Sequence, residues 1–374
     1  MPNYPKGKFY KGYGVFKKRN EIYNDIRIYR IPVIPRGDGT SFRLSLNYLS
    51  YVFFGLITAF SLIRKDYDII FVFEPSPITV ALPAILLKKI KRIPLCIWVL
   101  DLWPESVSAA GNLKSDLIPN ILLPIVKYIY EMCDLIMVSS RGFIDSISEK
   151  GVDKSKIKYF PQWSEDIFDK DNLISETNLK EIIPKGFVIM FAGNIGEAQD
   201  FPSVVKAASA LRRIKDLHWV VLGGGSREDW LKQSIIQNGL QENFHLLGQF
   251  PMENVPELYS YADALFITLK DEYIFSLTVP AKLQTYLASG KPILSMLNGE
   301  ASNIINEADA GLTAKSGDYI SFSKNIEELM QLDQSRISEM GNNSYSYLKK
   351  YFKSKNLLDQ AEDTFINLIK DSSD

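Results

Sequence analysis

Two glycine-rich loops each follow a predicted strand and precede a predicted helix. The first is "FAGNIGEAQDF" and the second is "VLGGGSRE", and their glycines are Gly193, Gly196, Gly223, Gly224 and Gly225. Glycines at such turns let the backbone approach a phosphate, and the helix that follows offers free N–H groups. Neither loop matches G-x-G-x-x-G, so the dinucleotide fingerprint is absent. The two loops therefore indicate phosphate binding, with ordinary tight turns as the alternative.

A lysine stands where a helix disfavours a cation. Pro280 suits the first turn of a helix, which places Lys282 in that turn. The positive end of the helix dipole opposes an ammonium group there. We therefore expect an anion near Lys282, with a lysine bent into solvent as the alternative.

Two carboxylates follow another predicted strand, in "WVLDLWPESVSAAG". Asp101 and Glu105 lie just past its end, and Trp103-Pro104 stiffens the segment between them. A carboxylate in a cleft can polarise a hydroxyl or orient a sugar. Helix capping by Asp101 is the alternative.

Metal and disulfide chemistry have few candidate residues. The chain has two histidines, His218 and His245, and two cysteines, Cys96 and Cys133. A His-rich or Cys-rich metal site is excluded, and we expect neither a metal nor another cofactor. Two cysteines in apolar surroundings make a disulfide framework improbable and favour a reducing compartment.

Short apolar runs alternate with helical patterns along the chain. Strands are expected at 68–73, 94–100, 134–140 and 156–161, with helices at 78–90, 117–131 and 141–150. The pattern restarts with strands at 186–193, 218–225, 243–250, 264–269 and 291–296, separated by helices at 200–214, 227–238, 255–262 and 280–289. Such alternation predicts an α/β fold of two doubly wound, Rossmann-like lobes.

The expected domains follow from this restart. Residues 1–163 form the N-terminal lobe, 164–186 a polar linker, and 187–350 the C-terminal lobe. Residues 351–374 form a C-terminal helix that we expect to pack back toward the N-terminal lobe. Ligands in such folds lie beyond the carboxyl ends of the strands, in the cleft that two such lobes form.

Charge divides the chain into unlike halves. Residues 1–160 carry a net charge of +9 and residues 161–374 a net charge of −10, which gives −1 overall. The basic half opens with a run that is interleaved with aromatic residues: Lys6, Lys8, Lys11, Lys17, Lys18 and Arg19. Such a run suits an anionic membrane surface or a phosphate-bearing partner, and a solvated surface is the alternative. No nucleic-acid motif accompanies it.

The most apolar stretch runs from Leu46 to Ile63. It has about the minimum length of a membrane span but includes Asn47, Ser50 and two tyrosines. We expect a buried or interface-lying helix in preference to a span.

The motifs in combination resemble the family 4 retaining glycosyltransferases of the GT-B fold. The resemblance rests on "DLWPES", "AGNIGEAQDF", "LGQFPMENVPELYSYADALFITLKDE" and "SLTVPAKLQTYLASGKPIL". The nearest subgroup is that of bacterial surface-polysaccharide enzymes, such as O-antigen transferases of amino-fucose sugars and capsule transferases. The resemblance implies a UDP- or GDP-linked sugar donor on the C-terminal lobe. It also implies an acceptor glycan, commonly on a membrane polyprenyl diphosphate, on the N-terminal lobe.

The resemblance also implies residue roles, with departures. Leu277 and Thr285 occupy positions where many members carry glutamates, and Asn194 and Gln199 replace an arginine and a lysine that hold the diphosphate. Lys282 is the cation left in the helix that faces the diphosphate. The implied donor site is Gly193, Asn194, Gly196, Gly223, Gly224, Gly225, Phe250, Ser276, Leu277, Thr278, Lys282 and Thr285, and the implied catalytic residues are Asp101, Glu105 and Lys282. Asp101 stands about where the family has a histidine.

Two rival functions stay open beside glycosyl transfer. One is a sugar-nucleotide 2-epimerase of the same fold, and the other is a non-catalytic binding subunit. The family resemblance places a strand, a Gly-rich loop, a helix and a second strand before a loop like "PNYPKGKFYKGY", so the N-terminal lobe is expected to be incomplete. The expected location is cytoplasmic, peripheral on the inner face of the cytoplasmic membrane.

Overall fold

Two compact units make up the chain. The computed structural model describes residue 3 and residues 7–110, 117–172 and 179–372. The first unit comprises Met1–Ser139, Phe143–Phe160 and Glu362–Asp374, and the second comprises Ser140–Gly142 and Pro161–Ala361.

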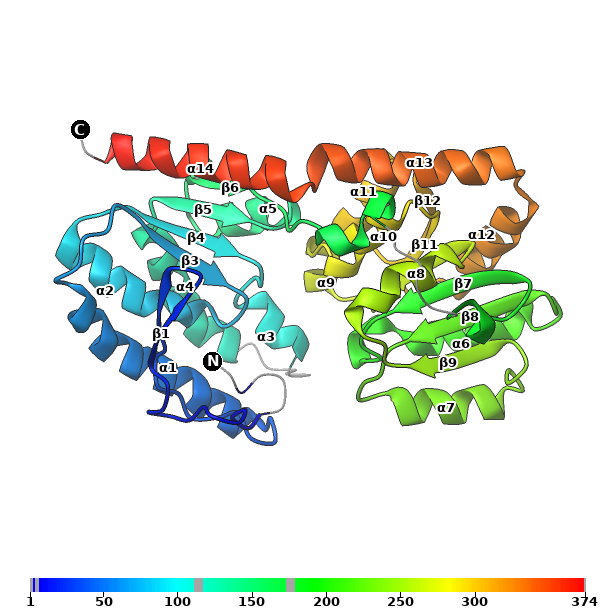
Figure 1. Cartoon of the computed structure of the whole chain (residues 1–374), viewed down its shortest axis with the longest axis horizontal. Coiled ribbons are helices and arrows are strands. Elements are labelled where there is room, and N and C mark those ends of the chain that lie inside the picture. The colour runs from blue at the N-terminus through cyan, green and yellow to red at the C-terminus, as the bar shows by residue number, and fades with distance from the viewer. Residues whose placement is uncertain (1–2, 4–6, 111–116, 173–178, 373–374) are drawn as a thin grey trace. The chain divides into compact units, whose positions relative to one another are not determined.

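A parallel sheet with the strand order β3-β4-β5-β6 forms the centre of the first unit (Figure 1). The strands are β3 (Ile70–Glu74), β4 (Leu95–Val99), β5 (Leu135–Val138) and β6 (Ile157–Tyr159). The helices are α1 (Ser41–Leu62), α2 (Leu82–Lys91), α3 (Glu105–Ala110), α4 (Leu117–Met132) and α5 (Gly142–Glu149), and a 3-10 turn, η1 (Ile78–Ala81), follows β3. All five residues of β4 are buried, as expected for a strand covered on both faces.

The two ends of the first unit add a hairpin and part of a helix. Strands β1 (Asn20–Tyr23) and β2 (Ile26–Tyr29) pair in an antiparallel manner, apart from the main sheet. The last part of α14 (Ser354–Asp371) belongs to this unit, where Phe365 packs on Phe71 of β3 with ring centroids 5.2 Å apart. β3 is an edge strand of its sheet. The expected further unit before the chain start stays a prediction.

Helix α1 has an unusual distribution of side chains. Its buried face carries Asn47, Ser50, Gly55, Thr58 and Ala59. The opposite face carries a row of large apolar side chains, each 54–72% exposed, which we call the α1 stripe: Phe42, Leu49, Phe53, Ile57 and Phe60. In the described ranges α1 alone is long and apolar enough to cross a membrane, judged by length and composition. The large side chains of this stretch therefore do not lie in the core.

The second unit contains a six-stranded parallel sheet with the order β12-β11-β10-β7-β8-β9. The strands are β7 (Phe187–Ala192), β8 (Leu217–Leu222), β9 (Phe244–Gly248), β10 (Ala264–Thr268), β11 (Ile293–Met296) and β12 (Gly311–Ala314). The helices are α6 (Phe201–Leu211), α7 (Glu228–Gln237), α8 (Val255–Ser260), α9 (Tyr273–Leu277), α10 (Ala281–Ser289), α11 (Glu300–Glu307), α12 (Tyr319–Gln331), α13 (Gln334–Tyr351) and the start of α14.

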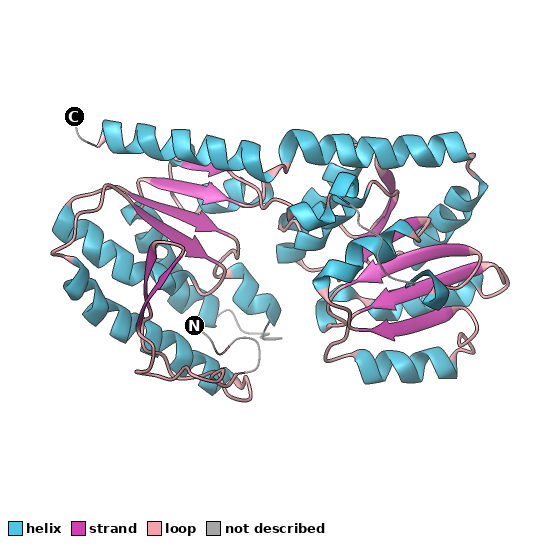
Figure 2. Ribbon diagram, viewed as in Figure 1, coloured by secondary structure: helices cyan, strands magenta, loops and turns pink. Residues whose placement is uncertain are grey.

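Helices cover both faces of this sheet (Figure 2). Along β7, Val188 and Met190 belong to one hydrophobic cluster, whereas Ile189 and Phe191 belong to another. Successive side chains of a strand point to opposite faces, so each face has its own core. The doubly wound α/β fold that the sequence predicts is confirmed.

Part of the expected linker packs into the second unit. Phe168 is buried in one of its two cores. Asp169 is also buried, and its carboxylate accepts hydrogen bonds from the hydroxyl of Tyr345 and, at 2.6 Å, from Nζ of Lys353. Residues 166–169 are therefore anchored to the helices near the end of the chain.

Candidate functional site

The strand order of the second unit identifies the edge where a ligand is expected. Connections run outward from β7 in one direction through β8 and β9, and in the other through β10, β11 and β12. The order reverses between β7 and β10. Open α/β sheets bind ligands at such a switch point, beyond the carboxyl ends of the strands. Gly193 follows β7 directly and Lys270 follows β10 by two residues.

The predicted glycine loops meet at this edge. The N–H of Gly193 donates to the carbonyl of Leu222 at 2.9 Å, and that of Ile195 donates to the carbonyl of Gly224 at 2.9 Å. A Cβ at Gly223 would lie 1.9 Å from the carbonyl oxygen of Gly193. Gly225 is similarly constrained, since its Cβ would lie 2.4 Å from the carbonyl oxygen of Ile195. Packing between the loops alone thus requires Gly223 and Gly225.

Lys282 lies against the first of these loops. Its Nζ is 3.8 Å from the ring centroid of Phe191, and a Cβ at Gly193 would lie 3.2 Å from the same Nζ. The structure shows no hydrogen bond or ion pair for this ammonium among the described residues. Burial lowers the pKa of Lys282 to about 7. Among the described residues the contact of this partly buried ammonium group is an aromatic face, an arrangement that favours an anion nearby.

The other predicted donor residues lie in the same unit with their own hydrogen bonds satisfied. Three hydroxyl groups donate to carbonyls of the preceding turn: Ser276 to Tyr273 at 2.7 Å, Thr278 to Ile274 at 2.8 Å, and Thr285 to Lys282 at 2.9 Å. Each hydroxyl oxygen can still accept a hydrogen bond. The carbonyl of Leu277 accepts from the hydroxyl of Ser140.

The remaining predicted residues of this unit contact neighbouring groups of the loops and of the core, and their role in donor binding stays a prediction. The N–H of Gly196 donates to Oε1 of Gln199 at 3.0 Å. The side chain of Asn194 lies close to Gly196 and Gly225. Phe250 is partly buried against one of the two cores.

Two cations beside the first loop are absent from the sequence-based prediction. Nε of Arg227 and Nζ of Lys270 both bind the carboxylate of Glu197. These two hydrogen bonds hold the pKa of Glu197 at about 2. The N–H of Lys270 also donates to the carbonyl of Ala198 at 2.9 Å, so the loop and the end of β10 are joined. The sequence could have indicated Lys270 as a site residue, because it lies just after an apolar strand. Its pairing with Glu197 could not be predicted from the sequence.

Asp101 lies at the carboxyl end of β4 in the first unit. Its Oδ2 accepts a hydrogen bond from the indole Nε1 of Trp103 at 3.0 Å. The same indole N–H lies 3.4 Å from the hydroxyl of Ser76, after β3. Among the described residues, the partner of the Asp101 carboxylate is thus the side chain of Trp103.

Glu105 is held by structural partners. Its Oε1 accepts from Nζ of Lys150 at 2.6 Å and from the hydroxyl of Ser146 at 3.1 Å. These contacts fix α3 against α5. Asp101, the other predicted catalytic carboxylate, does not take part in these contacts of Glu105 with Lys150 and Ser146. A catalytic role for Glu105 stays a prediction.

Glu74 is a buried acid that the sequence-based prediction did not name. It ends β3 and is 0% exposed, and no side chain among the described residues donates a hydrogen bond to its carboxylate. Burial raises its pKa well above the usual value, and the nearby charge of Asp101 raises it further. The buried hydroxyl of Tyr130 also has no hydrogen-bond partner among the described residues, and burial raises its pKa, with a smaller contribution from Glu74. Its position at the end of an apolar strand could have indicated Glu74 as a candidate from the sequence.

The predicted basic run lies on the surface of the first unit. Lys8, Lys11, Lys17, Lys18 and Arg19 are exposed, and Lys6 lies outside the described residues. No group of three or more His, Cys, Asp or Glu side chains suited to a metal occurs in the ranges that the structure describes.

Comparisons with known proteins match the second unit most clearly. Residues 175–347, which lie in this unit, match the family described as "Glycosyl transferases group 1". The chain is 26% identical over 249 residues to the probable glycosyltransferase WbjE of Pseudomonas aeruginosa, which covers 64% of this chain and 61% of that protein. It is 28% identical over 165 residues to the putative colanic acid biosynthesis glycosyl transferase WcaI of Escherichia coli K12, which covers 42% of this chain and 39% of that protein. The chain thus spans less than two thirds of the length of these relatives.

Solved structures match both units. A glycosyltransferase from Rickettsia africae has a TM-score of 0.70 and 16% identity, covering 87% of this chain and 83% of that one. Anabaena HepE in complex with UDP has a TM-score of 0.69 and 13% identity, covering 86% and 84%. At such identities the likeness shows the fold, which is GT-B.

Proposed function

We propose that this protein is a glycosyltransferase of surface-polysaccharide biosynthesis. The second unit binds a UDP- or GDP-linked sugar, and the first unit binds a glycan acceptor on a polyprenyl diphosphate. The observation that carries the proposal is Lys282, whose ammonium has no polar partner among the described residues and lies beside Gly193 at the switch point. The group 1 domain match and the UDP in the HepE structure support it.

The proposed chemistry needs charge stabilisation above all. The acceptor hydroxyl oxygen bonds to the anomeric carbon while the bond from that carbon to the diphosphate breaks. Lys282 and N–H groups near Gly193 and Thr278 stabilise the charge that develops on the diphosphate, the largest electrostatic contribution in such a step. Attack from the face that the leaving group departs retains the configuration and passes the hydroxyl proton to the departing phosphate oxygen. Asp101 orients the hydroxyl, and lysine and helix dipole make a metal unnecessary.

The test of this function is turnover with defined substrates. Purified protein is incubated with UDP- and GDP-sugars, with and without a polyprenyl-diphosphate glycan, and both released nucleotide and glycosylated lipid are measured. Lys282→Ala should lower turnover by about 10²–10³-fold, in line with loss of one donor to a developing oxyanion. Lys282→Arg should restore little, since a planar guanidinium does not fill the site of a compact ammonium.

Lys206 provides the matched control, since it is an exposed lysine of the same unit. Lys206→Ala should keep wild-type turnover. Wild-type turnover in Lys282→Ala would remove the donor assignment. An epimerised nucleotide sugar formed without acceptor would favour the 2-epimerase, and nucleotide-sugar binding without any product would favour the binding subunit.

We also propose that the first unit docks on the cytoplasmic face of a membrane. The α1 stripe places five large apolar side chains outward on a helix whose inward residues are small or polar. Helices that face lipid show this arrangement, with small residues at the protein contact. The exposed basic run in the same unit suits anionic headgroups. Docking would bring the enzyme to a lipid-linked acceptor.

A further inference from the structure

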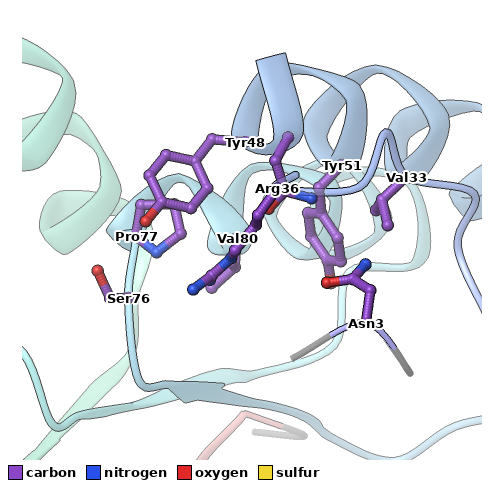
Figure 3. Close-up of a pocket in the computed structure, with 9 residues that line it drawn as sticks. Asn3, Val33, Arg36, Tyr48, Tyr51, Ser76, Pro77 and Val80 are labelled. Atoms are coloured by element: carbon purple, nitrogen blue, oxygen red, sulfur yellow. The ribbon is translucent and has the colours of Figure 1, made fainter. Parts of the chain in front are cut away.

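A pocket of about 170 Å³ lies within the first unit (Figure 3). Four segments line it: the chain around Asn3, the segment directly before α1, α1 itself, and the turn after β3 that leads into η1. The lining residues are Asn3, Val33, Arg36, Asn47, Tyr48, Tyr51, Ser76, Pro77 and Val80. None of these residues is among those that the sequence predicts for a site. The pocket is smaller than the roughly 300 Å³ at which sites for drug-sized ligands begin. It therefore fits one small chemical group rather than a nucleotide.

Several polar groups around this pocket can donate hydrogen bonds, whereas the amide nitrogen of Asn47 already donates to the carbonyl of Ile34 and the hydroxyl of Ser76 accepts from Trp103. Arg36 is the one charged residue among the nine, and its guanidinium lies 5.7 Å from the ring centroid of Tyr48. Figure 3 shows the Arg36 side chain between the rings of Tyr48 and Tyr51. Burial raises the pKa of Tyr51, so its hydroxyl stays protonated and can donate. Asn3 is 3% exposed, and its Nδ2 has no hydrogen-bond partner among the residues that the structure describes.

This set of donors indicates the charge of the ligand. The nine lining residues include an arginine, tyrosine hydroxyls and side-chain amides, but no carboxylate. Such a set of donors suits an anion with several oxygen atoms. A phosphoryl group has that geometry, and arginine holds it with paired N–H groups. Val33, Pro77 and Val80 add apolar surface for the group that bears the phosphate.

The position of the pocket links it to the acceptor chemistry. Ser76 of the pocket and Asp101 lie at the ends of adjacent strands, and the indole N–H of Trp103 reaches both of them. Tyr51 projects from the face of α1 that is opposite to the α1 stripe. One helix thus contributes to the pocket on one side and carries the proposed membrane face on the other.

We propose that this pocket binds a phosphoryl group of the acceptor, held by Arg36 with Tyr48, Tyr51 and Asn3. The inference rests on the proposed function for the identity of the molecule that bears the phosphate. The bound phosphate fixes the acceptor so that its sugar hydroxyl lies toward Asp101. Arg36 is then a positioning residue, because it touches the acceptor away from the reacting hydroxyl.

Binding of soluble probes tests the pocket directly. Titration calorimetry of the full chain uses N-acetylglucosamine 1-phosphate, inorganic phosphate, N-acetylglucosamine, and farnesyl phosphate in detergent micelles. Both soluble phosphates should bind, and the neutral sugar should not. Arg36→Ala should weaken binding of the sugar phosphate by about 10- to 100-fold, the loss expected for a hydrogen bond to a charged group. Tyr51→Phe, which keeps the ring, should weaken it by about 2- to 10-fold.

Arg64→Ala is the matched control, because Arg64 is an exposed arginine of the same unit outside the pocket. It should bind all probes as the wild type does. Arg36-dependent binding of farnesyl phosphate without binding of the soluble phosphates would support the same site with the lipid phosphate as its occupant. Equal binding by wild type and Arg36→Ala, or equal loss in Arg64→Ala, would overturn the proposal.

UDP binding separates this proposal from the proposed function. Arg36→Ala should bind UDP with wild-type affinity, because the second unit holds the nucleotide. A wild-type protein that binds sugar phosphate through Arg36 but no nucleotide sugar would leave the pocket intact and reject the glycosyltransferase. If the protein turns over nucleotide sugars but binds phosphate independently of Arg36, the glycosyltransferase function would stand and the pocket proposal would be rejected.

Discussion

Lys282 and Glu74 each carry an ionisable group that burial pushes toward its neutral form. The pKa of the Lys282 ammonium falls to about 7, and the pKa of the Glu74 carboxyl rises well above its usual value. The two groups differ in whether a ligand could restore their charged form. A phosphate beside Lys282 would restore its charge, whereas Glu74 is fully enclosed between strand ends and no ligand can reach it. We therefore propose Lys282 as a binding group, whereas we expect Glu74 to affect stability.

Binding of UDP should weaken as the pH rises above about 7. The free protein loses the Lys282 proton near that pH, whereas a diphosphate next to the ammonium raises its pKa in the complex. Binding therefore takes up a proton, and affinity falls by up to about tenfold per pH unit above the pKa of the free protein. Calorimetry in two buffers of different ionisation enthalpy measures this uptake. Lys282→Met should bind UDP more weakly and without this pH dependence, and a flat pH profile in the wild type would contradict the assignment.

Glu74→Gln should stabilise the protein more at pH 8 than at pH 4. The folded carboxyl has the higher pKa, so the folded state binds more protons and wild-type stability falls as pH rises above about 4.3, the unfolded value. The slope reaches at most about 1.4 kcal/mol per pH unit. Glutamine keeps the shape without ionising and should remove this contribution. Urea unfolding of both proteins at the two pH values measures the difference, and an equal effect at both would show that Glu74 does not titrate as inferred.

Helix α1 reverses the usual amphipathic rule, and this gives one element two distinct surfaces. Its inward face is small enough for η1 and α2 to approach closely: a Cβ at Gly55 would lie 2.6 Å from the ring of Pro83. Its outward face is the α1 stripe. A large exposed apolar surface on a soluble protein marks a contact with another molecule. Lipid is the contact we propose, because the neighbouring basic run supplies complementary charge.

Replacing Phe53 and Phe60 together by serine should reduce sedimentation with vesicles by at least about tenfold. Each phenylalanine contributes about 1.5–3 kcal/mol when fully buried in an apolar phase. The matched control is Ile236→Ser, because Ile236 is 63% exposed on α7 of the second unit. Binding to anionic vesicles should also fall as salt rises, since exposed charges are screened. Equal binding to neutral and anionic vesicles at all salt concentrations would reject the electrostatic part, and equal loss in Ile236→Ser would reject the α1 stripe.

The whole molecule consists of two units with separate sheets and separate cores. A ligand stabilises the folded state of the unit that it contacts. The acidic and basic halves of the sequence follow the same division. We therefore expect a nucleotide and an acceptor phosphate to stabilise different units of the molecule.

Hydrogen exchange should show these separate effects. UDP at about 100 times its dissociation constant should stabilise the second unit by about 2.7 kcal/mol and slow exchange in β7, β8 and α10. Sugar phosphate should slow exchange near Arg36 and in α1 instead. Mass spectrometry of peptides from the full chain resolves the two regions. Protection by UDP confined to β3–β6 would contradict the assignment of the donor to the second unit.

The sequence alone determined the architecture. Runs such as "LCIWV" and "FVIMFA" are apolar on both faces, which only a strand inside a covered parallel sheet can bury. Local periodicity is enough for that inference, and it also placed Asp101, Gly193 and Lys282 at strand or helix ends. Only the tertiary structure decided which side chains meet. Glu197 binds residues 30 and 73 positions away, and the spacing of residues along the chain does not encode such distances in space.

The same limit applies to the direction of side chains. The sequence of an apolar helix such as α1 does not show whether its large residues face a core or lie on the surface, because composition does not determine the orientation of the helix. Gly223 shows the converse case. Its residue type suggested contact with a phosphate, yet the carbonyl of Gly193 already occupies the space of a Cβ there. The pocket around Arg36 joins four segments of the chain, and it exists only because folding brings their side chains together.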